Sequence, residues 1–322
     1  MIDFLKIEAL IKSSDEVFIT AHKNIDLDAL GSILGIYYVA NSLGKNAFIV
    51  IDDEEVTNEV KRALANIKSV VVPIKCSDIE KFSNKSLLVV TDTSENKRVQ
   101  NEKLLDIKNK IVIDHHIETS DGIDDCTYKY VDISSSSATE IVLDLVNELN
   151  IYIPAEMATI MLAGIYIDTN GFLLKTTEKT HIYTSMLYKF GADNKEAQYL
   201  LKQNFNEFKR RQKLTLATEF YNEFAVTTSD NKYSTVELAK ACDVLLTFNN
   251  VEAAFVIARL DEDVVGISAR SLGNIDVEDI MSHFNGGGHK TAAATRVSGK
   301  TVEEVKNELL EFLGGVRWKL YL

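Results

Sequence analysis

Hydrophobic residues in the first part of the chain form short β-branched runs, and longer segments of helical periodicity separate them. This alternation is typical of βαβ units that build a parallel sheet. The β-branched runs predict strands at residues 17–21, 47–51, 69–72, 87–91 and 111–113. The first part of the chain is therefore predicted to be an α/β domain.

Helical periodicity between the strands predicts several helices, and the residues at their ends support the boundaries. A helix over residues 28–43 stops at Gly44, a common residue just after a helix C-terminus. Four serines at residues 134–137 supply an N-cap for a helix that follows them. Further helices are predicted at residues 54–67, 155–167 and 178–190.

The pattern changes in the last third of the chain. Residues 193–223 are polar, favour helix and contain neither glycine nor proline, so they are predicted to be a helical linker. Beyond the linker, strands are predicted at 224–228, 254–259 and 264–269, and helices at 277–284 and 301–313. We therefore expect a parallel-sheet α/β domain over 1–192, the linker over 193–223 and a smaller α/β domain over 224–322.

Acidic and histidine side chains stand at the ends of the predicted strands. They are His22, Asp26 and Asp28 after the first strand, Asp92 after the fourth, and Asp114, His115 and His116 after the fifth. The carboxyl ends of parallel strands lie along one edge of a sheet, where ligands bind in open α/β folds. These side chains are therefore predicted to converge. Asp168, which ends an apolar helix shortly before Gly171, is a further candidate.

Each of these groups has a structural alternative when it is taken alone. Asp26 or Asp28 could serve only as a helix N-cap, and Asp168 could only solvate a helix end. Asp92 could open an ordinary loop, and one histidine of a pair is often structural. Two histidines after an aspartate at a buried strand end are harder to explain by packing, because their polar groups need partners.

Taken together, the aspartates and histidines form a ligand set without thiolates. Such a set suits hard-to-borderline divalent cations, of which Mn²⁺, Mg²⁺, Fe²⁺ and Co²⁺ are the candidates. There are enough ligands for two ions. Two ions about 3.5–4 Å apart can hold a bridging hydroxide and stabilise the attacking and leaving oxygens of a phosphoryl transfer. The sequence therefore predicts a two-metal active site.

A glycine-rich stretch in the last domain is a candidate anion-binding element. The stretch reads Gly286-Gly287-Gly288-His289-Lys290. Consecutive glycines let a ligand approach bare backbone amides closely. Arg270 follows a predicted strand and could grip a phosphate through its planar guanidinium. The structural alternatives are an ordinary surface loop and a solvated arginine.

Composition and charge narrow the classes of partner. The formal net charge of −13 argues against a protein that coats duplex nucleic acid, because such binding requires phosphate neutralisation by Lys and Arg. A small phosphate-bearing substrate stays compatible, since bound cations make a site locally positive. No apolar run approaches the roughly 20 residues of a membrane helix, and the N-terminus lacks a signal-peptide pattern. The three cysteines are far apart and indicate reduced thiols, so we expect a cytoplasmic protein.

The order of these motifs resembles that of the DHH phosphoesterases. The chain contains His-x-x-x-Asp-x-Asp at 22–28, Asp92, Asp-His-His at 114–116, Asp168, and then the glycine-rich motif of the DHH-associated domain. Within this superfamily, residues 21–31, 162–169 and 265–273 resemble the catalytic region of GdpP-type cyclic-di-AMP phosphodiesterases. The resemblance implies a DHH domain followed by a DHH-associated domain.

The resemblance also implies a role for each matching residue. One Mn²⁺ would be held by His22, Asp26 and Asp92, and the second by Asp28, Asp92, His116 and Asp168. His115 would lie beside the substrate phosphate, and Asp114 would orient a metal-binding histidine. With the bridging Asp92, these two residues form the implied catalytic group. In the second domain, the nucleotide would be bound by Arg270, Gly286, Gly287, Gly288 and His289.

The function implied by the resemblance is Mn²⁺-dependent hydrolysis of cyclic-di-AMP to pApA, and further to AMP. The partner would be a small nucleotide and not duplex nucleic acid, and a homodimer is left open. One alternative is a nanoRNase or pAp phosphatase that uses the same two metal ions. Another is a nucleotide-binding sensor that has lost the chemistry. The intact set of metal motifs speaks against the sensor.

Overall fold

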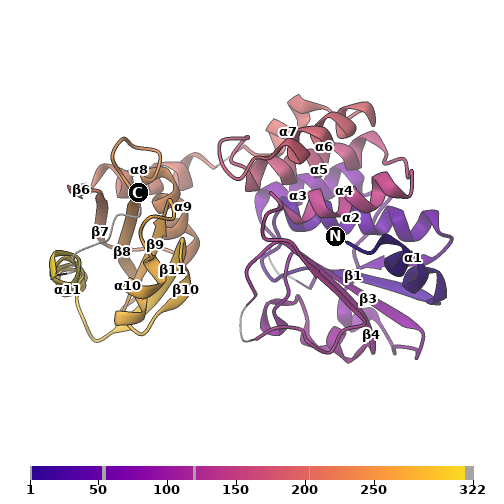
Figure 1. Ribbon diagram of the computed structural model, residues 1–322, viewed down its shortest axis with the longest axis horizontal. Helices are drawn as coiled ribbons and strands as arrows, with labels where there is room; N and C mark the ends of the chain where they lie inside the picture. Colours follow the sequence, from indigo (N-terminus) through magenta and orange to yellow (C-terminus); the bar gives the residue numbers. More distant parts are fainter. Residues whose placement is uncertain (1, 53–55, 119–120, 203, 316–322) are drawn as a thin grey trace. The chain divides into compact units, whose positions relative to one another are not determined.

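The computed structural model describes residues 2–52, 56–118, 121–202 and 204–315. The chain folds into two compact units, Met1–Lys202 and Gln203–Leu322 (Figure 1). The segment predicted as a linker is divided between them. Helix α7 (Asn194–Leu200) belongs to the first unit, whereas α8 (Phe205–Leu216) and β6 (Thr218–Tyr221) belong to the second. Residues 54–55 of one predicted helix and 316–322 of the predicted last domain lie outside the described residues.

A five-stranded parallel sheet forms the centre of the first unit. Its strands are β1 (Glu16–Thr20), β2 (Asn46–Ile49), β3 (Ser86–Thr91), β4 (Asn109–Asp114) and β5 (Tyr128–Val131). Their order is β2-β1-β3-β4-β5. The chain places β2 on one side of β1, and it then places β3, β4 and β5 on the other side. Such a reversal opens a crevice beyond the carboxyl ends of β1 and β3, where ligands bind in folds of this type.

One face of this sheet is covered by α-helices and the other by loops and short 3₁₀ helices. The helices are α1 (Phe4–Ser13), α2 (Leu27–Ser42), α3 (Asn58–Ile67), α4 (Ala138–Glu148), α5 (Ala155–Asp168), α6 (Glu178–Lys189) and α7. Helix α2 lies on the sheet and is itself covered by α4 and α5, so it is buried on almost every side (Figure 1). On the opposite face, Phe18, Val90 and Val112 pack against Cys76 and Leu104 of two short 3₁₀ helices.

Two glycines allow α2 to approach its neighbouring helices closely. A Cβ atom on Gly164 of α5 would lie only 2.7 Å from a backbone carbonyl oxygen of α2 and 3.0 Å from the Cα of Asp28. A Cβ atom on Gly31 of α2 would lie 2.6 Å from Thr139 Oγ1 of α4. These separations are shorter than ordinary van der Waals contact. The two glycines therefore determine how close the start of α2, which carries Asp28, lies to the end of α5, which carries Asp168.

The second unit contains a six-stranded mixed sheet. Its strands are β6, β7 (Phe224–Lys232), β8 (Ala253–Asp261), β9 (Val264–Ser271), β10 (Gly287–His289) and β11 (Ala292–Ser298), in the order β10-β11-β9-β8-β7-β6. Strands β7 and β8 are parallel, and the other neighbouring pairs are antiparallel. Helix α9 (Thr235–Leu245) packs on one face, and α10 (Val277–His283) and α11 (Val302–Gly315) pack on the other.

The strands predicted at 17–21, 47–51, 87–91 and 111–113 are confirmed to within a few residues. The strand predicted at 69–72 is wrong, because this segment forms turns that expose Val70 and Val72. The fifth strand is β5, which the sequence did not reveal because its residues are all only partly buried and show no apolar run. The expected combination of a parallel-sheet α/β unit with a second, smaller α/β unit is confirmed.

Several elements of the second unit were not predicted. They are β6, α9, β10 and β11. Within the glycine-rich stretch, for which an ordinary surface loop was the structural alternative, Gly287–His289 forms an edge strand that pairs with β11. None of the described helices is both long and apolar enough to cross a membrane.

We expect Gly164→Ala to destabilise the first unit, because the added methyl group would collide with the backbone of α2. The free energy of unfolding should fall by roughly 1–3 kcal/mol, the usual range for overpacking. Calorimetric unfolding of both proteins measures the difference. Gly314→Ala is the control, since a Cβ on Gly314 in α11 would meet no atom within 4 Å and alanine favours helix. An unchanged unfolding temperature for Gly164→Ala would refute this packing constraint.

Candidate metal centre

The candidate ligands lie in one cluster at the carboxyl edge of the first sheet. Their positions are His22, Asp26 and Asp28 after β1, Asp92 after β3, His115 and His116 after β4, and Asp168 at the end of α5. Among the described residues, three groups have ligand atoms within 4.8 Å of one another. The groups are His22 with Asp26 and Asp92, Asp92 with His115 and His116, and Asp28 with His115 and Asp168. The side chains expected to converge are therefore brought together.

Asp92 lies at the centre of this cluster. Its Oδ2 is 3.2 Å from His22 Nε2, and its Oδ1 is 3.2 Å from His115 Nε2. The residue has a φ of +58°, which turns the chain sharply at the end of β3, and its N–H donates to the carbonyl of Ile113. Aspartate tolerates this backbone conformation better than most residues. Because its two oxygens face different imidazoles, Asp92 can bridge two ions.

Backbone contacts orient His22 and Asp26 and leave one ligand atom of each available. His22 Nδ1 is 2.7 Å from the carbonyl oxygen of Lys23, and a carbonyl only accepts, so Nδ1 donates and Nε2 is the ring nitrogen that faces the cluster. Asp26 is the N-cap of α2, where its Oδ1 accepts from the N–H groups of Asp28 and Ala29. Its Oδ2 faces His22 Nε2 at 3.9 Å. The N-cap alternative is therefore correct for Asp26, but it accounts for only one carboxylate oxygen.

Asp28 is fully buried where α2 meets α4. Its carboxylate accepts the N–H of Ala138 at 2.7 Å and that of Thr139 at 2.9 Å, the first two residues of α4. The positive end of the helix dipole thus stabilises a charge that burial alone would disfavour. Asp28 Oδ2 also lies 3.8 Å from His115 Nε2, and Asp168 Oδ2 lies 3.2 Å from the same nitrogen. One imidazole therefore faces both carboxylates.

The two histidines of the Asp-His-His sequence have different environments. His115 is buried, and its Nε2 faces Asp28 and Asp168. The His116 side chain is 40% exposed, and its Nδ1 donates to Asp114 Oδ1 at 2.8 Å. The resemblance implied the reverse, with His116 as the ligand beside these carboxylates and His115 beside the substrate. In the structure Asp114 also accepts the N–H of both histidines, and the ring of His115 is the one that points toward Asp28 and Asp168.

Burial and mutual charge shift the pKa values in the cluster. Burial raises the pKa of Asp28 to about 6, with a contribution from Asp92, and burial beside Asp28 raises the pKa of Asp168 well above its usual range. Burial alone would lower the pKa of His22 and of His115, but the Asp92 carboxylate raises them to about 9 and about 10. The same imidazoles outweigh burial and hold the pKa of Asp92 well below its usual range. Protons thus occupy positions that divalent cations would take.

Unpaired polar atoms at the centre of the cluster fit a metal site. Asp92 Oδ1 and both ring nitrogens of His115 are buried and make no hydrogen bond with a described residue. Buried polar atoms are normally paired, so these indicate a ligand. Metal–ligand bonds of about 2.1–2.2 Å place neighbouring ligands about 3 Å apart. The separations of 3.2 Å around His115 Nε2 agree with this geometry, and the oxygen and imidazole donors suit Mn²⁺ and similar cations.

Sequence reasoning missed Gln100, which orients the turn that carries His22. Its side-chain Nε2 donates to the carbonyl oxygen of His22 at 2.7 Å, and its Oε1 accepts from the N–H of Asp52 at 2.8 Å. The N–H of Lys23 also donates to the carbonyl of Arg98 at 2.6 Å. Because 78 residues separate Gln100 from His22, no local pattern in the sequence could have indicated this contact.

The predicted nucleotide-binding residues lie in the second unit. Arg270 is on β9, with its Nε 3.5 Å from Asp243 Oδ1 of α9. The glycine-rich stretch ends at His289 of β10. Strand register aligns His289 with Ala292, and Ala292 with Arg270. Residues that are aligned across neighbouring strands point to the same face of a sheet, so Arg270 and His289 share a face.

Both units match known domains. Residues 16–165 match the DHH family, N-terminal domain, and residues 221–315 match the DHHA1 domain. These matches place the two domains in the order that the sequence motifs implied. The chain belongs to the DHH family.

The chain is similar to the cyclic-di-AMP phosphodiesterases PdeA of Listeria monocytogenes and GdpP of Bacillus subtilis. PdeA is 34% identical over 97% of this chain and 49% of its own length, and GdpP is 35% identical over 97% and 50%. The chain thus spans about half the length of these curated relatives. The bifunctional oligoribonuclease and PAP phosphatase NrnA of Thermus thermophilus is 26% identical over 94% of this chain and 91% of its own length.

A solved structure supports the fold. The crystal structure of an exopolyphosphatase-related protein from Bacteroides fragilis matches 96% of this chain and 95% of that protein, with a TM-score of 0.80. Sequence identity to that protein is 20%, so the likeness shows a shared fold. The arrangement of a parallel-sheet unit followed by a mixed-sheet unit is therefore found in a second protein.

We expect Mn²⁺ to raise the unfolding temperature, because two cations would neutralise the buried carboxylates and would bind only the folded chain. At a free concentration 100 times the Kd, each ion adds about 2.7 kcal/mol of stability. Calorimetry of EDTA-treated protein with and without Mn²⁺ measures the effect. Asp92→Asn keeps the shape of the side chain but removes its charge, and should abolish most of the increase. An unfolding temperature that does not respond to Mn²⁺ would count against a cation site here.

Proposed function

We propose that the chain is a Mn²⁺-dependent phosphodiesterase that hydrolyses cyclic-di-AMP to pApA. The observation that carries this proposal is a pair of ligand groups that share one carboxylate. One group combines His22, Asp26 and Asp92, and the other combines Asp28, Asp92, His115 and Asp168. Two bound ions would polarise the phosphoryl oxygens and lower the pKa of an attacking water molecule. A site of this design is suited to breaking a phosphate ester bond.

The chain's own residues position these groups and the substrate. Asp92 lies between the two ligand groups, since its oxygens face the imidazoles of His22 and His115. The half-exposed ring of His116 is held at Nδ1 by Asp114, which leaves Nε2 for a ligand. The ring held in this way presents Nε2 to a phosphate oxygen of the substrate. Asp114 therefore acts as a positioning residue for His116.

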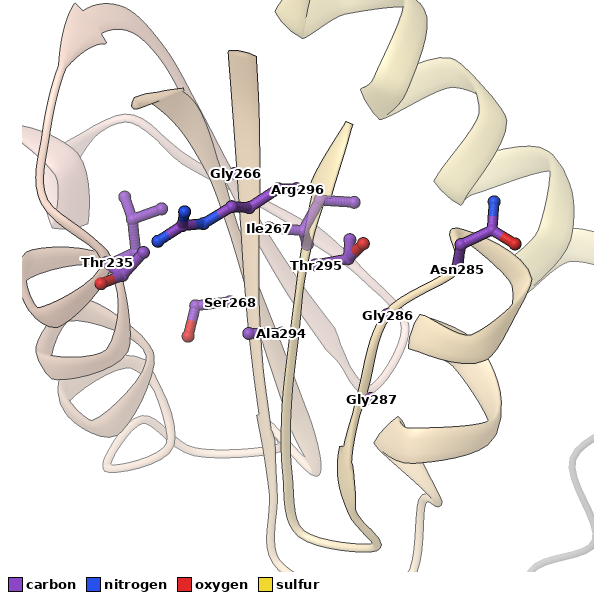
Figure 2. A pocket seen from close by; sticks show the side chains of 11 residues that line it. Thr235, Gly266, Ile267, Ser268, Asn285, Gly286, Gly287, Ala294, Thr295 and Arg296 are labelled. Carbon is purple, nitrogen blue, oxygen red and sulfur yellow. The ribbon is translucent and has the colours of Figure 1, made fainter. Parts of the chain in front are cut away.

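The choice of cyclic-di-AMP rests on the relatives. PdeA and GdpP are both named for this substrate, and their 34% and 35% identity extends over nearly the whole chain. In the second unit, Arg270 and His289 share one face of the sheet and supply a guanidinium and an imidazole for the nucleotide phosphates. Of the three glycines, Gly287 has open space at its Cβ position and so gives the nucleotide close access to the backbone of the edge strand (Figure 2). Hydrolysis of pApA to AMP would complete the reaction.

A second candidate function is that of an oligoribonuclease and pAp phosphatase. The match to NrnA favours this function, because it extends over 91% of the NrnA length. The two-metal chemistry would be the same, because any phosphate ester can lie between the two ligand groups. The candidates differ only in the nucleotide that the chain binds.

The reaction is proposed to take place in the cytoplasm. Cys76, Cys126 and Cys242 are all free thiols in the structure, and two of them are buried. Unpaired cysteines of this kind are typical of proteins from a reducing compartment.

Replacement of the two histidines should separate metal binding from substrate contact. His115→Ala removes an imidazole that faces three carboxylates, so the protein should retain about one ion in place of two. His116→Ala should keep both ions but lower kcat by roughly 100-fold, as the loss of a donor to the transition state does. Elemental analysis and kinetics on the same samples measure both effects. Equal metal loss in both variants would contradict the assignment of His115 as the ligand.

Purified protein with Mn²⁺ should convert cyclic-di-AMP to pApA, with a higher kcat/KM than for pApA or pAp. Chromatography of the products after timed incubation measures all three rates. The His115→Ala variant is the control for contaminating nucleases. Product formation no greater than in this control would reject the hydrolase, and a much faster rate on either linear substrate would select the second candidate.

A further inference from the structure

The turn that carries His22 has little regular structure of its own. It connects the end of β1 at Thr20 to the start of α2 at Leu27, and within it Asn24 has a φ of +57°. His22 is only 6% exposed, so its surroundings are supplied by the protein. The position of this candidate ligand therefore depends on the contacts that the turn makes with other segments.

A segment between β3 and β4 lies antiparallel to this turn. Val99 of the segment forms an isolated β-bridge with His22. Hydrogen bonds between the two backbones flank the bridge at 3.0 and 2.6 Å, and they join Ala21 to Gln100 and Lys23 to Arg98. In a pair of this type the two bridged residues do not bond to each other. The carbonyl group of His22 therefore requires another partner.

The side chain of Gln100 supplies that partner. Its Nε2 donates to the carbonyl oxygen of His22 at 2.7 Å, and its Oε1 accepts the N–H of Asp52 at 2.8 Å. The two contacts use opposite ends of the amide, so together they fix its orientation. Gln100 is 6% exposed, and a rotation of the amide would leave buried polar groups unpaired.

Asp52 anchors this contact to the rest of the first unit. The residue follows β2, and its Oδ1 accepts the N–H of Cys76 at 2.7 Å. Its Oδ2 accepts from the side-chain amide of Asn101, the neighbour of Gln100. Val99, on the other side of Gln100, is fully buried in the apolar cluster on the loop-covered face of the sheet. The amide of Gln100 is therefore held in place by packing as well as by hydrogen bonds.

The two ligand groups of the metal centre are oriented by different contacts. The N-terminal N–H groups of α4 hold Asp28, and Asp114 holds the turn that carries His115. Gln100 acts on the other group, which consists of His22, Asp26 and Asp92. A change at Gln100 should therefore affect the two cations unequally.

We propose that Gln100 is a positioning residue for the cation of the His22 ligand group. Its amide holds the peptide group of His22, and the contact of Nδ1 with the Lys23 carbonyl holds the ring. Together these contacts aim Nε2 at Asp92 Oδ2, 3.2 Å away. A ligand that is already oriented loses less freedom when the ion binds, so Gln100 raises the affinity for this cation. The inference deepens the proposed function and rests on it for the pair of cations.

Calorimetric titration of Mn²⁺ into protein that has been treated with EDTA and freed of the chelator tests this assignment. Gln100→Met keeps the approximate size of the side chain but removes both polar ends. One ion should then bind roughly 10- to 100-fold more weakly than in the wild type, the usual effect of losing a group that orients a metal ligand. The other ion should keep its affinity. Lys97→Met, the same replacement at an exposed position of the same segment, should keep the wild-type affinity for both ions.

A double-mutant cycle identifies the affected ion. His22→Ala should leave one ion bound, and the addition of Gln100→Met should not weaken that ion further, because both changes act on the same ligand group. A residue with only a structural role would weaken both ions, and it would also weaken the ion that remains in the double variant. This readout therefore separates positioning from general stability.

Circular dichroism checks that each variant folds. If Gln100→Met does not fold, Gln100→Asn takes its place. Asparagine keeps an amide in the buried position but is one methylene group too short to reach both partners, so the same selective loss of one ion is expected.

The proposal is overturned if the folded Gln100 variant binds both ions as the wild type does, or if it weakens both equally. It is also overturned if the double variant binds its remaining ion more weakly than His22→Ala does, or if the wild type binds fewer than two ions. Failure of the proposed function would differ: one ion would be lost selectively from the Gln100 variant, but the wild type with Mn²⁺ would hydrolyse no nucleotide.

Discussion

Negative charge concentrated at one edge of a sheet is the constraint on which the first unit depends. Five aspartates from three strand ends and one helix end meet there, and most of them are buried. Three of them have specific stabilising partners: the N-terminus of α4 for Asp28, that of α2 for Asp26, and imidazoles for Asp92. These contacts still leave Asp92 Oδ1 and both ring nitrogens of His115 without a hydrogen bond, which fits a site that binds cations.

Helix packing away from the ligands determines the geometry of this site. Asp28 and Asp168 lie on different helices, and their separation depends on how closely α2 approaches α4 and α5. Glycines at positions 31 and 164 permit that approach, and Thr139 Oγ1 also donates to the backbone carbonyl of Asp28. A shift of one helix would change the distance between two carboxylates that face the same imidazole. Residues that never contact a metal ion can therefore control metal affinity.

The sequence predicted most of the metal site because its chemistry follows from local patterns. Apolar runs that stop at Asp or His place those residues at strand ends, and parallel strands bring the ends together. The inward histidine could not be chosen in this way, since the choice depends on how Asp114 caps the turn. Likewise, β5 and β10 have no apolar run of their own, and β5 pairs with residues of β4 that lie 17 positions earlier in the chain. Non-local contacts of this kind, including that of Gln100 with His22, are outside the reach of sequence periodicity.

Two relatives with different named substrates indicate which residues determine the choice of substrate. PdeA and NrnA each match more than 90% of this chain, yet one is named for cyclic-di-AMP and the other for oligoribonucleotides and PAP. A pair of cations recognises a phosphate ester and cannot distinguish the nucleosides attached to it. Substrate choice must therefore depend on residues outside the ligand set, with shape and hydrogen-bonding groups that differ between nucleotides.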